Sequence, residues 1–216
     1  PSRPSDQGFD ESLVHLAGGI GQVGDFTNYF KMETSYFDPV LWHNNKQKAY
    51  KGYCSDIFTQ NAINFIEKNH DQPFFCYLSF NAPHTPLQVP DKYYRIYKDI
   101  DPSEGIDPEL LPLVDMNEKS DEDARKVYAM VTNIDDNLNQ LFQKLEVLGI
   151  EENTIVIFMT DNGPQQARFV GGMRGRKSSV YRGGIRVPFF MRYPAKFSGN
   201  REMDQMAAHI DLLPTL

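Results

Sequence analysis

The chain has 216 residues, of which 40% are apolar and 12% aromatic. This composition is typical of one folded domain with its own hydrophobic core, and it excludes an intrinsically disordered chain. The formal net charge of −7 argues against generic nucleic-acid binding, since nucleic-acid-binding domains present a basic face to the phosphates. An anionic substrate remains compatible with this charge, because basic residues gather between Arg168 and Arg192.

Cys54 and Cys76 are the two cysteines of the chain. They provide neither a disulfide framework nor a zinc-ligand spacing, and we interpret them as small buried side chains. A disulfide between them is possible, but no pattern supports it. No apolar run approaches the roughly 18 residues that a membrane-spanning helix requires. The chain begins at Pro1 without a signal peptide, and we expect both of its ends to be cuts within a longer protein.

Residues 1–50 are rich in glycine, asparagine and aromatic residues and have no clear period. The run GGIGQVGDF lacks the preceding strand and following helix of a dinucleotide-binding motif, so we interpret it as a surface loop. Between residues 55 and 69 the apolar side chains recur at helical spacing, which predicts a helix with Ser55 as its N-cap.

The seven residues 74–80, FFCYLSF, are continuously apolar apart from one serine. Such a run predicts a strand covered on both faces, as in a parallel sheet. Residues 81–120 contain several prolines and many charges, and we expect a long excursion with little regular structure. A strong helical period from Asp121 to Leu148 follows, and Gly149 is placed as its C-terminal cap.

Two further strands are predicted, at residues 154–160 and 188–193. Strands that alternate with helices favour an α/β domain with a mainly parallel sheet flanked by helices. In open α/β sheets, ligands bind beyond the carboxyl ends of the strands. Two polar segments follow strands in this way: residues 81–84 and the pair Asp161-Asn162.

The pair Asp161-Asn162 closes the run TIVIFMTDNG. A carboxylate and an amide carbonyl side by side are hard oxygen ligands of the kind that Ca²⁺ or Mg²⁺ takes. The alternative is an ordinary turn after a strand, because Asp, Asn and Gly are common turn residues.

His84 stands in the proline-flanked sequence NAPHTPL. It could donate a hydrogen bond to an anionic oxygen or act as an acid, or it could simply satisfy nearby backbone carbonyls. The stretch 171–188, GGMRGRKSSVYRGGIRVP, combines five glycines with four arginines and Lys177. It could bring cations and backbone N–H groups to an anion, or it could be a solvated basic loop.

Together these segments resemble the central part of the sulfatase family, in the same order along the chain. The strand-ending TDNG of the family matches residues 160–163, and its histidine in an APH-type loop matches His84. The family pattern G-x-K-x-x-x-[YF]-E-G-G-x-R-x-P is met by Gly175, Lys177, Tyr181, Gly183, Gly184, Arg186 and Pro188. The runs GFDES, GYCSDIFTQNAINFI and HIDLLPTL add to the resemblance, and FDPVLWHN points to the arylsulfatase branch.

The resemblance implies an alkaline-phosphatase-like fold, truncated here at both ends, with residues 1–216 forming the central part of one catalytic domain. It also implies a formylglycine nucleophile, whose hydrate attacks sulfur, and a Ca²⁺ ion that neutralises charge on the sulfate oxygens. Asp161 and Asn162 correspond to two metal ligands. His84 and Lys177 correspond to catalytic residues that hold sulfate oxygens and the leaving oxygen.

Two departures from the family pattern bear on this expectation. The nucleophile motif C-x-P-S-R does not occur in the chain, and Pro1-Ser2-Arg3 imitates only its tail. We therefore expect the nucleophile and the remaining metal ligands to lie upstream, so that this chain is inactive alone. Arg182 replaces the glutamate that usually follows the tyrosine, where it could add a cation near the substrate or lie in solvent.

The sequence thus predicts part of a Ca²⁺-dependent sulfuric ester hydrolase acting on a sulfated sugar, steroid, glycolipid or aryl sulfate. The rivals are a phosphatase, phosphodiesterase or phosphoglycerol transferase of the same superfamily, and a non-catalytic pseudoenzyme or binding module. No nucleic-acid partner and no membrane span are expected. Family habit favours an extracytoplasmic location.

Overall fold

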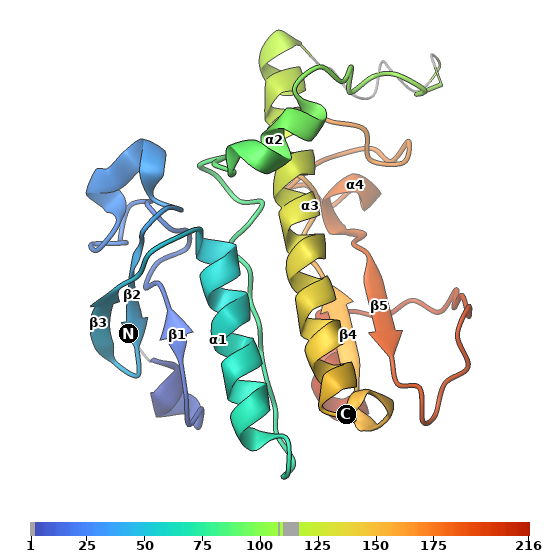
Figure 1. Cartoon of the computed structure of the whole chain (residues 1–216). Helices are drawn as coiled ribbons and strands as arrows, with labels where there is room; N and C mark the ends of the chain where they lie inside the picture. Colours follow the sequence, from blue (N-terminus) through green and yellow to red (C-terminus); the bar gives the residue numbers. More distant parts are fainter. Residues whose placement is uncertain (1–2, 108, 110–116) are drawn as a thin grey trace.

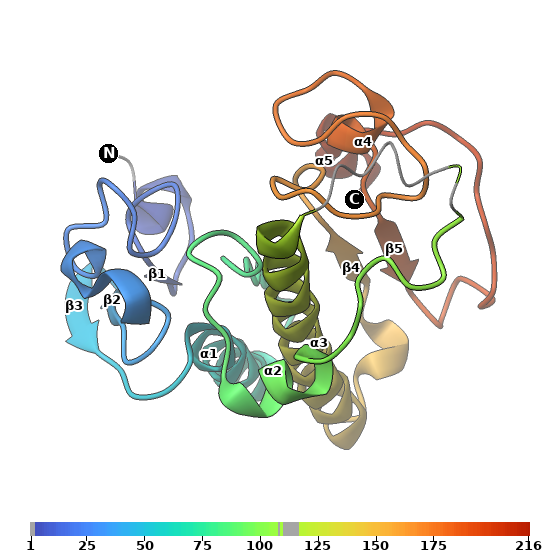
Figure 2. The same cartoon turned by 90° about the horizontal axis from the view of Figure 1, so that it is seen from above.

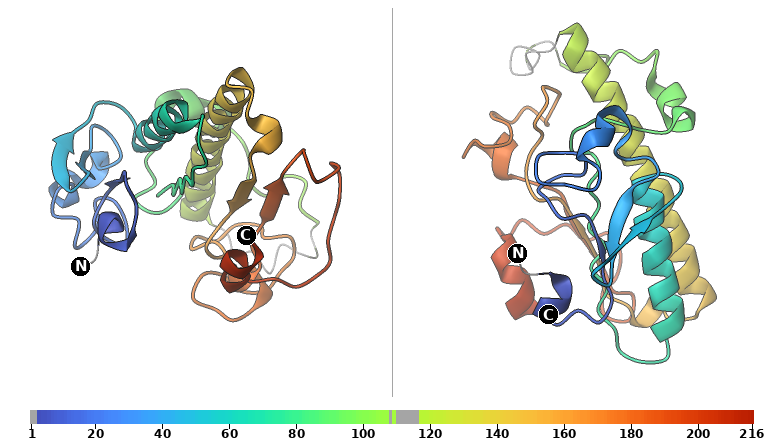
Figure 3. Two further views of the ribbon diagram at one scale, coloured as in Figure 1. Left: turned by 90° about the horizontal axis from the view of Figure 1, so that it is seen from below. Right: turned by 90° about the vertical axis from the view of Figure 1, so that its left-hand side faces the viewer.

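The computed structural model describes residues 3–107, 109 and 117–216. Two long helices, α1 (Cys54–Asn69) and α3 (Glu118–Val147), lie side by side in the middle of the molecule (Figures 1 and 2). The strands β1 (Leu13–Val14), β2 (Val40–His43) and β3 (Lys46–Ala49) lie beyond α1, and β4 (Val156–Met159) and β5 (Phe189–Arg192) lie beyond α3. The view from below in Figure 3 shows the helix pair between the two sets of strands.

The remaining elements are short. They are η1 (Pro4–Gln7), η2 (Tyr29–Thr34), α2 (Asp91–Tyr97), η4 (Glu151–Asn153), α4 (Arg182–Ile185), η5 (His209–Asp211) and α5 (Leu212–Thr215). The helix α2 packs against α3 through three tyrosines, and Tyr93 donates a hydrogen bond to Asp136 at 2.8 Å. The expectation of little regular structure at residues 81–120 therefore misses α2. Residues 108 and 110–116 of that stretch lie outside the described residues.

Apolar side chains of α1 and α3 form the core between the two helices. Phe58 of α1 meets Met130 and Ile134 of α3 in one cluster, and Ile63 and Ile66 meet Leu141 and Leu145 in a second. Burying one such side chain contributes roughly 1.5–3 kcal/mol. The predicted helical faces are therefore confirmed as the surfaces that hold the helices together.

Two ends of these helices illustrate how local sequence sets their bounds. Asn117 caps α3, because its side-chain oxygen accepts hydrogen bonds from the backbone N–H groups of Lys119 and Ser120, so the helix begins before the predicted Asp121. Gly149 follows α3 with φ +68°, as the predicted glycine cap requires. The prediction of Ser55 as a cap is wrong: α1 begins at Cys54, whose N–H donates to the carbonyl of Tyr36 at 2.8 Å.

The predicted parallel sheet does not occur among the described residues. The strands form two small antiparallel sheets, β1-β2-β3 and β4-β5. Residues 74–80 are extended but unpaired, and their burial alternates: Phe75 and Tyr77 are 66% and 67% exposed, whereas their neighbours face inward. The expectation of a strand buried on both faces is therefore wrong, since only one face of this segment meets the core. The strands expected at residues 154–160 and 188–193 are confirmed as β4 and β5.

The cysteines are both free, and Cys54 is buried whereas Cys76 is half-buried. Burial raises the pKa of the Cys54 thiol, which keeps it protonated and unreactive at neutral pH. In the part of the chain that the structure describes, no helix combines the length and apolar character needed to cross a membrane.

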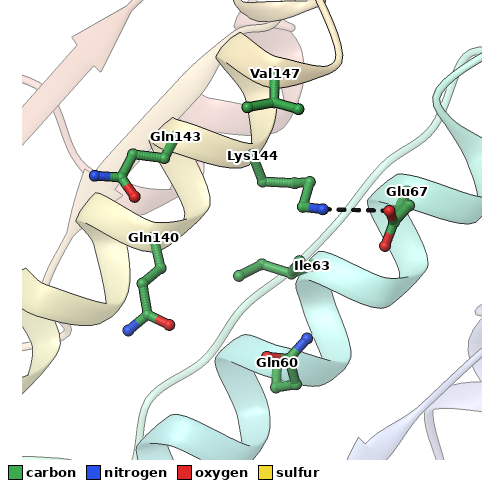
Figure 4. Close-up of a pocket in the computed structure, with 7 residues that line it drawn as sticks. All are labelled: Gln60, Ile63, Glu67, Gln140, Gln143, Lys144 and Val147. Carbon is green, nitrogen blue, oxygen red and sulfur yellow. Dashed lines mark hydrogen bonds and ion pairs between the residues drawn. The ribbon is translucent and has the colours of Figure 1, made fainter.

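An open groove of about 350 Å³ runs along the surface between α1 and α3 (Figure 4). Lys144 and Glu67 form an ion pair of 3.2 Å across it, and the other labelled side chains are glutamines, Ile63 and Val147. None of the predicted site residues lines this groove.

Candidate functional site

The turn at residues 160–163 begins where β4 ends. Asp161 is exposed, and its Oδ1 accepts the backbone N–H of Asn162 at 2.8 Å. The side-chain nitrogen of Asn162 donates to the carbonyl of Gly163 at 2.9 Å. The Asn162 side-chain oxygen is the acceptor of the amide group, so it is the atom that can bind a cation. The turn therefore presents a carboxylate and an amide oxygen, which is a chemically suitable donor pair for a hard cation.

The basic loop is fastened directly to this turn. The N–H of Gly163 donates to the carbonyl of Gly184, and the N–H of Lys177 donates to the carbonyl of Pro164, both at 2.9 Å. Backbone–backbone bonds of this kind hold the loop independently of its side chains. The structure thus brings the backbone at Lys177 beside the turn that contains Asp161 and Asn162, some fifteen positions away in sequence.

Glycine is required where the turn and the loop meet. A Cβ atom added to Gly163 would lie 1.9 Å from the carbonyl oxygen of Gly183, and one added to Gly183 would lie 2.2 Å from that of Gly175. The two backbones can approach this closely only because side chains are absent. In this chain the family-pattern glycines at 163, 183 and 184 therefore allow the backbones of the turn and the loop to pack closely.

His84 lies in a separate loop, held mainly by side chains. Its Nδ1 lies 2.9 Å from the carbonyl oxygen of Thr85 and 3.3 Å from the side-chain nitrogen of Gln22. Both contacts engage Nδ1, so Nε2 is left as the ring atom that can meet a ligand. The buried Tyr36 donates its hydroxyl to the His84 carbonyl at 2.7 Å. Burial raises the pKa of the Tyr36 phenol, so the hydroxyl keeps its proton.

The run GGIGQ packs against this loop, which corrects its interpretation as a surface loop. Ile20 is fully buried, and its N–H donates to the side-chain oxygen of Asn81 at 3.2 Å. Gln22 donates to the carbonyl of Thr85 at 2.8 Å. A Cβ added to Gly19 would lie 3.2 Å from Nδ1 of His84. The glycines here allow close approach to the histidine loop, a role that no sequence pattern indicated.

His15 is a site neighbour that the sequence reasoning missed. Burial lowers its pKa, and the nearby His84 lowers it further, whereas Asp25 and a hydrogen bond with Asn81 raise it. Its Nδ1 is buried and has no hydrogen-bond partner within the described ranges. Nothing marked His15 in advance, because a lone histidine after a two-residue strand carries no motif.

The two parts of the site rest on the same hydrophobic core. Ala82, two residues before His84, is buried in the cluster against which Phe158 of β4 packs. Within the described part of the chain, no hydrogen bond or ion pair joins His84 to Lys177 or Asp161. At the far side of the turn, Nε2 of His209 donates to the carbonyl of Thr160 at 2.9 Å, which ties the C-terminal HIDLLPTL segment to the predicted ligands.

The oxygen ligands of the turn account for only part of a metal site. No group of three or more His, Cys, Asp or Glu side chains is arranged to hold a metal ion in the described ranges. Ca²⁺ takes about six to eight oxygen ligands, and Asp161 and Asn162 supply two suitable ones. The residues are thus compatible with a share of a calcium site and need further ligands to complete it.

The sequence profile of the family described as Sulfatase matches residues 5–216. The chain belongs to the sulfatase family. Among curated relatives it is 29% identical over 222 residues to the uncharacterized sulfatase YdeN of Escherichia coli (strain K12). That match covers 99% of this chain but 33% of the relative, so the chain spans about a third of the relative's length.

Solved structures show the same family relationship. The putative sulfatase yidJ from Bacteroides fragilis superposes with a TM-score of 0.72 at 26% identity, covering 83% of this chain and 40% of that one. Ps i-CgsB in complex with k-i-k-neocarrahexaose superposes with a TM-score of 0.66 at 29% identity, covering 89% and 41%. These sulfatases have the alkaline-phosphatase-like α/β fold. The predicted α/β class is therefore confirmed, but the predicted parallel sheet is not.

Proposed function

We propose that the full-length protein containing this chain is a sulfuric ester hydrolase, with the arylsulfatase type as the working assignment. The observation that carries the proposal is the fastening of the Lys177 loop onto the Asp161-Asn162 turn by two backbone hydrogen bonds. This arrangement supports the proposal because it fixes the backbone of Lys177 next to the turn that carries the proposed oxygen ligands. Membership of the sulfatase family supports the choice of sulfate over other esters.

In this proposal Asp161 and Asn162 contribute two oxygen ligands to one Ca²⁺ ion. When bound, the ion supplies positive charge that stabilises the sulfate oxygens. Lys177 donates hydrogen bonds to those oxygens, whose negative charge must be stabilised in the transition state. His84 faces the leaving oxygen through Nε2, since Nδ1 is engaged by Thr85 and Gln22. These contacts at Nδ1 orient the ring for this role and leave the other nitrogen available.

The nucleophile completes the proposal and comes from outside this chain. We propose a formylglycine, formed from the Cys or Ser of a C-x-P-S-R or S-x-P-S-R motif elsewhere in the full-length protein. This chain alone is then inactive, because it has neither that nucleophile nor the remaining ligands. An aryl sulfate assay of the chain beside the full-length protein tests this, and comparable turnover by the two would contradict it.

The substrate we propose is a sulfate ester, with a sulfated sugar favoured over a steroid, glycolipid or simple aryl sulfate. The support is the likeness to Ps i-CgsB, whose structure holds k-i-k-neocarrahexaose. Following the habit of the family, we also propose an extracytoplasmic location for the protein.

One experiment separates this function from its rivals. Turnover of an aryl sulfate and of the matching aryl phosphate is measured with the full-length protein, with Ca²⁺ and after chelation. We expect sulfate turnover to exceed phosphate turnover and to fall on chelation. Preferred phosphate turnover would favour a phosphatase of the same superfamily, and turnover of neither ester would favour a non-catalytic binding module.

A separate substitution tests the assignment of Asp161 as a metal ligand. Asp161→Ala should lower both bound calcium and turnover, because it removes one of the charged oxygen donors. Asp204→Ala is the matched control, since Asp204 is also exposed and lies on the stretch between β5 and η5, outside the turn. Unchanged calcium content and rate in Asp161→Ala would remove Asp161 from the metal site.

A further inference from the structure

The backbone of His84 is held at both its N–H and its carbonyl by two other residues of this chain. The N–H donates to the carbonyl of Asn81 at 2.9 Å, and the carbonyl accepts the hydroxyl of Tyr36 at 2.7 Å. The side-chain nitrogen of Asn81 in turn donates to the hydroxyl oxygen of Tyr36. These three residues therefore form a closed circuit of hydrogen bonds, which we call the Tyr36 network.

Tyr36 is itself fixed in place on several sides. It is fully buried, and its ring stacks on that of Tyr53 with 5.8 Å between the centroids. Its N–H donates to the side-chain oxygen of Gln88, and its carbonyl accepts the N–H of Cys54, both at 2.8 Å. Because Cys54 is the first residue of α1, the Tyr36 hydroxyl ties the His84 carbonyl to the helical core.

The hydroxyl of Tyr36 serves hydrogen bonding and is not needed to fill space. A phenylalanine ring would pack on Tyr53 in the same way, and burying a hydroxyl costs free energy unless it is paired. Here the hydroxyl is paired twice, as the donor to His84 and as the acceptor from Asn81. A buried network whose members are all paired holds its groups in one arrangement. The group held in this way is the peptide that carries the His84 side chain.

A second buried tyrosine fastens the same segment at a point away from His84. The hydroxyl of Tyr53 donates to the carbonyl of Gln88 at 2.8 Å. Tyr53 is 3% exposed and Tyr36 is 0% exposed, so the two hydroxyls are similarly buried. They differ in the carbonyl that they hold. A comparison of the two therefore separates general support of the segment from a specific effect on His84.

We propose that Tyr36, together with Asn81, is a positioning residue for His84 that keeps Nε2 directed at the leaving oxygen of the ester. The inference rests on the proposed function and deepens it. The contacts of Nδ1 with Thr85 and Gln22 fix the imidazole ring relative to its loop. The Tyr36 network fixes the backbone from which that ring extends. Both are needed, because a displacement of about 1 Å can lower a rate by about 10²-fold.

Tyr36→Phe in the full-length protein tests the inference, because it removes the hydroxyl and keeps the ring. Turnover is measured with phenyl sulfate and with 4-nitrophenyl sulfate. The nitro group stabilises the negative charge on the leaving oxygen, so a hydrogen bond from His84 matters more for phenyl sulfate. We expect kcat to fall about tenfold for phenyl sulfate and about twofold or less for 4-nitrophenyl sulfate, with KM nearly unchanged for both.

Tyr53→Phe is the matched control, because it removes a buried hydroxyl from the same segment without touching His84. Its thermal unfolding should show a loss of stability comparable to that of Tyr36→Phe, but the ratio of its two rates should remain that of the unmodified protein. A loss of folded protein lowers both rates by one factor and leaves this ratio alone. An unchanged ratio in Tyr36→Phe, or an equal change of the ratio in Tyr53→Phe, would overturn the inference.

Asn81→Asp decides the question if Tyr36→Phe does not fold. The carboxylate has nearly the shape of the amide and still accepts the N–H of Ile20. It cannot donate to the Tyr36 hydroxyl, and it competes with the His84 carbonyl as an acceptor of that hydroxyl. We expect the same selective loss of phenyl sulfate turnover, and an unchanged ratio of the two rates would again overturn the inference.

Amide hydrogen exchange distinguishes failure of this inference from failure of the proposed function. Turnover of neither ester by the unmodified protein would contradict the proposed function. Exchange followed by mass spectrometry still reports on the network, since the His84 N–H is one of its donors. In Tyr36→Phe we expect severalfold faster exchange in peptides covering residues 81–86 and no change in peptides covering residues 60–69 of α1. Unchanged exchange at residues 81–86 would overturn the inference with or without turnover.

Discussion

The Lys177 loop and the His84 loop are held in place by different bonds. The Lys177 loop is joined to the turn after β4 by backbone hydrogen bonds and by glycine packing. The His84 loop is joined to its surroundings chiefly through the side chains of Gln22, Tyr36 and Asn81. We therefore expect the first arrangement to tolerate changes of most side chains and the second to depend on its polar side chains.

This difference determines how each region should respond to substitution. In the Lys177 loop, replacing an exposed side chain should change binding or rate and leave stability nearly intact, but replacing a glycine should disturb the fold. In the His84 loop, the same polar side chains both support the fold and orient the histidine. Substitutions there should change stability and rate together.

The largest effect is expected for Lys177→Ala in the full-length protein. Removing a donor aimed at developing negative charge typically lowers kcat by about 10²–10³. Steady-state kinetics with an aryl sulfate measure this effect, and thermal unfolding should show little loss of stability, because the loop is held through the Lys177 backbone. Arg201→Ala serves as the control for loss of an exposed cation. A full rate in Lys177→Ala would contradict its assignment.

Gly163→Ala should have the next largest effect, and it should fall on stability. The added methyl would meet the Gly183 carbonyl at 1.9 Å, so the two backbones must separate and the Gly163–Gly184 hydrogen bond must lengthen. Overpacking of this kind costs about 1–3 kcal/mol, and we expect the upper end. Denaturant unfolding measures the loss. Gly199→Ala is the matched control, because nothing lies within 4 Å of its added Cβ; equal stability of the two variants would disprove the packing role.

The contrast between the two regions also explains what sequence could predict. The TDNG turn and the Lys177 loop are contiguous motifs whose glycines and charges are visible in the sequence, and they lie together in the structure. The helices α1 and α3 were predictable for a similar reason, because a helical period reports directly on the buried face. Gly149 marked the end of α3 through a local backbone requirement.

The missed features depend on contacts between distant segments. The GGIGQ run meets the His84 loop some sixty positions away, and no local pattern encodes such a contact. The parallel sheet was inferred from the apolar run at residues 74–80, but an apolar run does not specify which strand lies beside it. Ser55 was expected to cap α1. The helix instead begins at Cys54, whose N–H donates to the carbonyl of the distant Tyr36.

Gln22→Ala tests the side-chain support of the His84 loop, with a smaller expected effect. The variant loses hydrogen bonds to the carbonyl and hydroxyl of Thr85, at 2.8 and 3.0 Å. A typical intramolecular hydrogen bond contributes about 1 kcal/mol, so we expect a loss of about that size in the free energy of unfolding, together with a reduced rate. Gln60→Ala is the control, since Gln60 bonds only to the exposed Asn64 among the described residues. Loss of stability without any loss of rate would separate the loop from the reaction.

The smallest effect is expected from His15, and it should depend on pH. Burial is the main cause that lowers the folded-state pKa of His15 below its ordinary 6.5. At pH values between the folded-state pKa of His15 and its unfolded-state pKa, the unfolded chain binds more protons than the folded one. The free energy of unfolding therefore falls as the pH drops through 6.5. His15→Asn should therefore flatten the decline in melting temperature between about pH 7.5 and about pH 5.5, the range in which histidines titrate. His70→Asn, which changes an exposed histidine at the end of α1, should leave the decline as it is. An equally steep decline in His15→Asn would show that the buried ring contributes nothing to it.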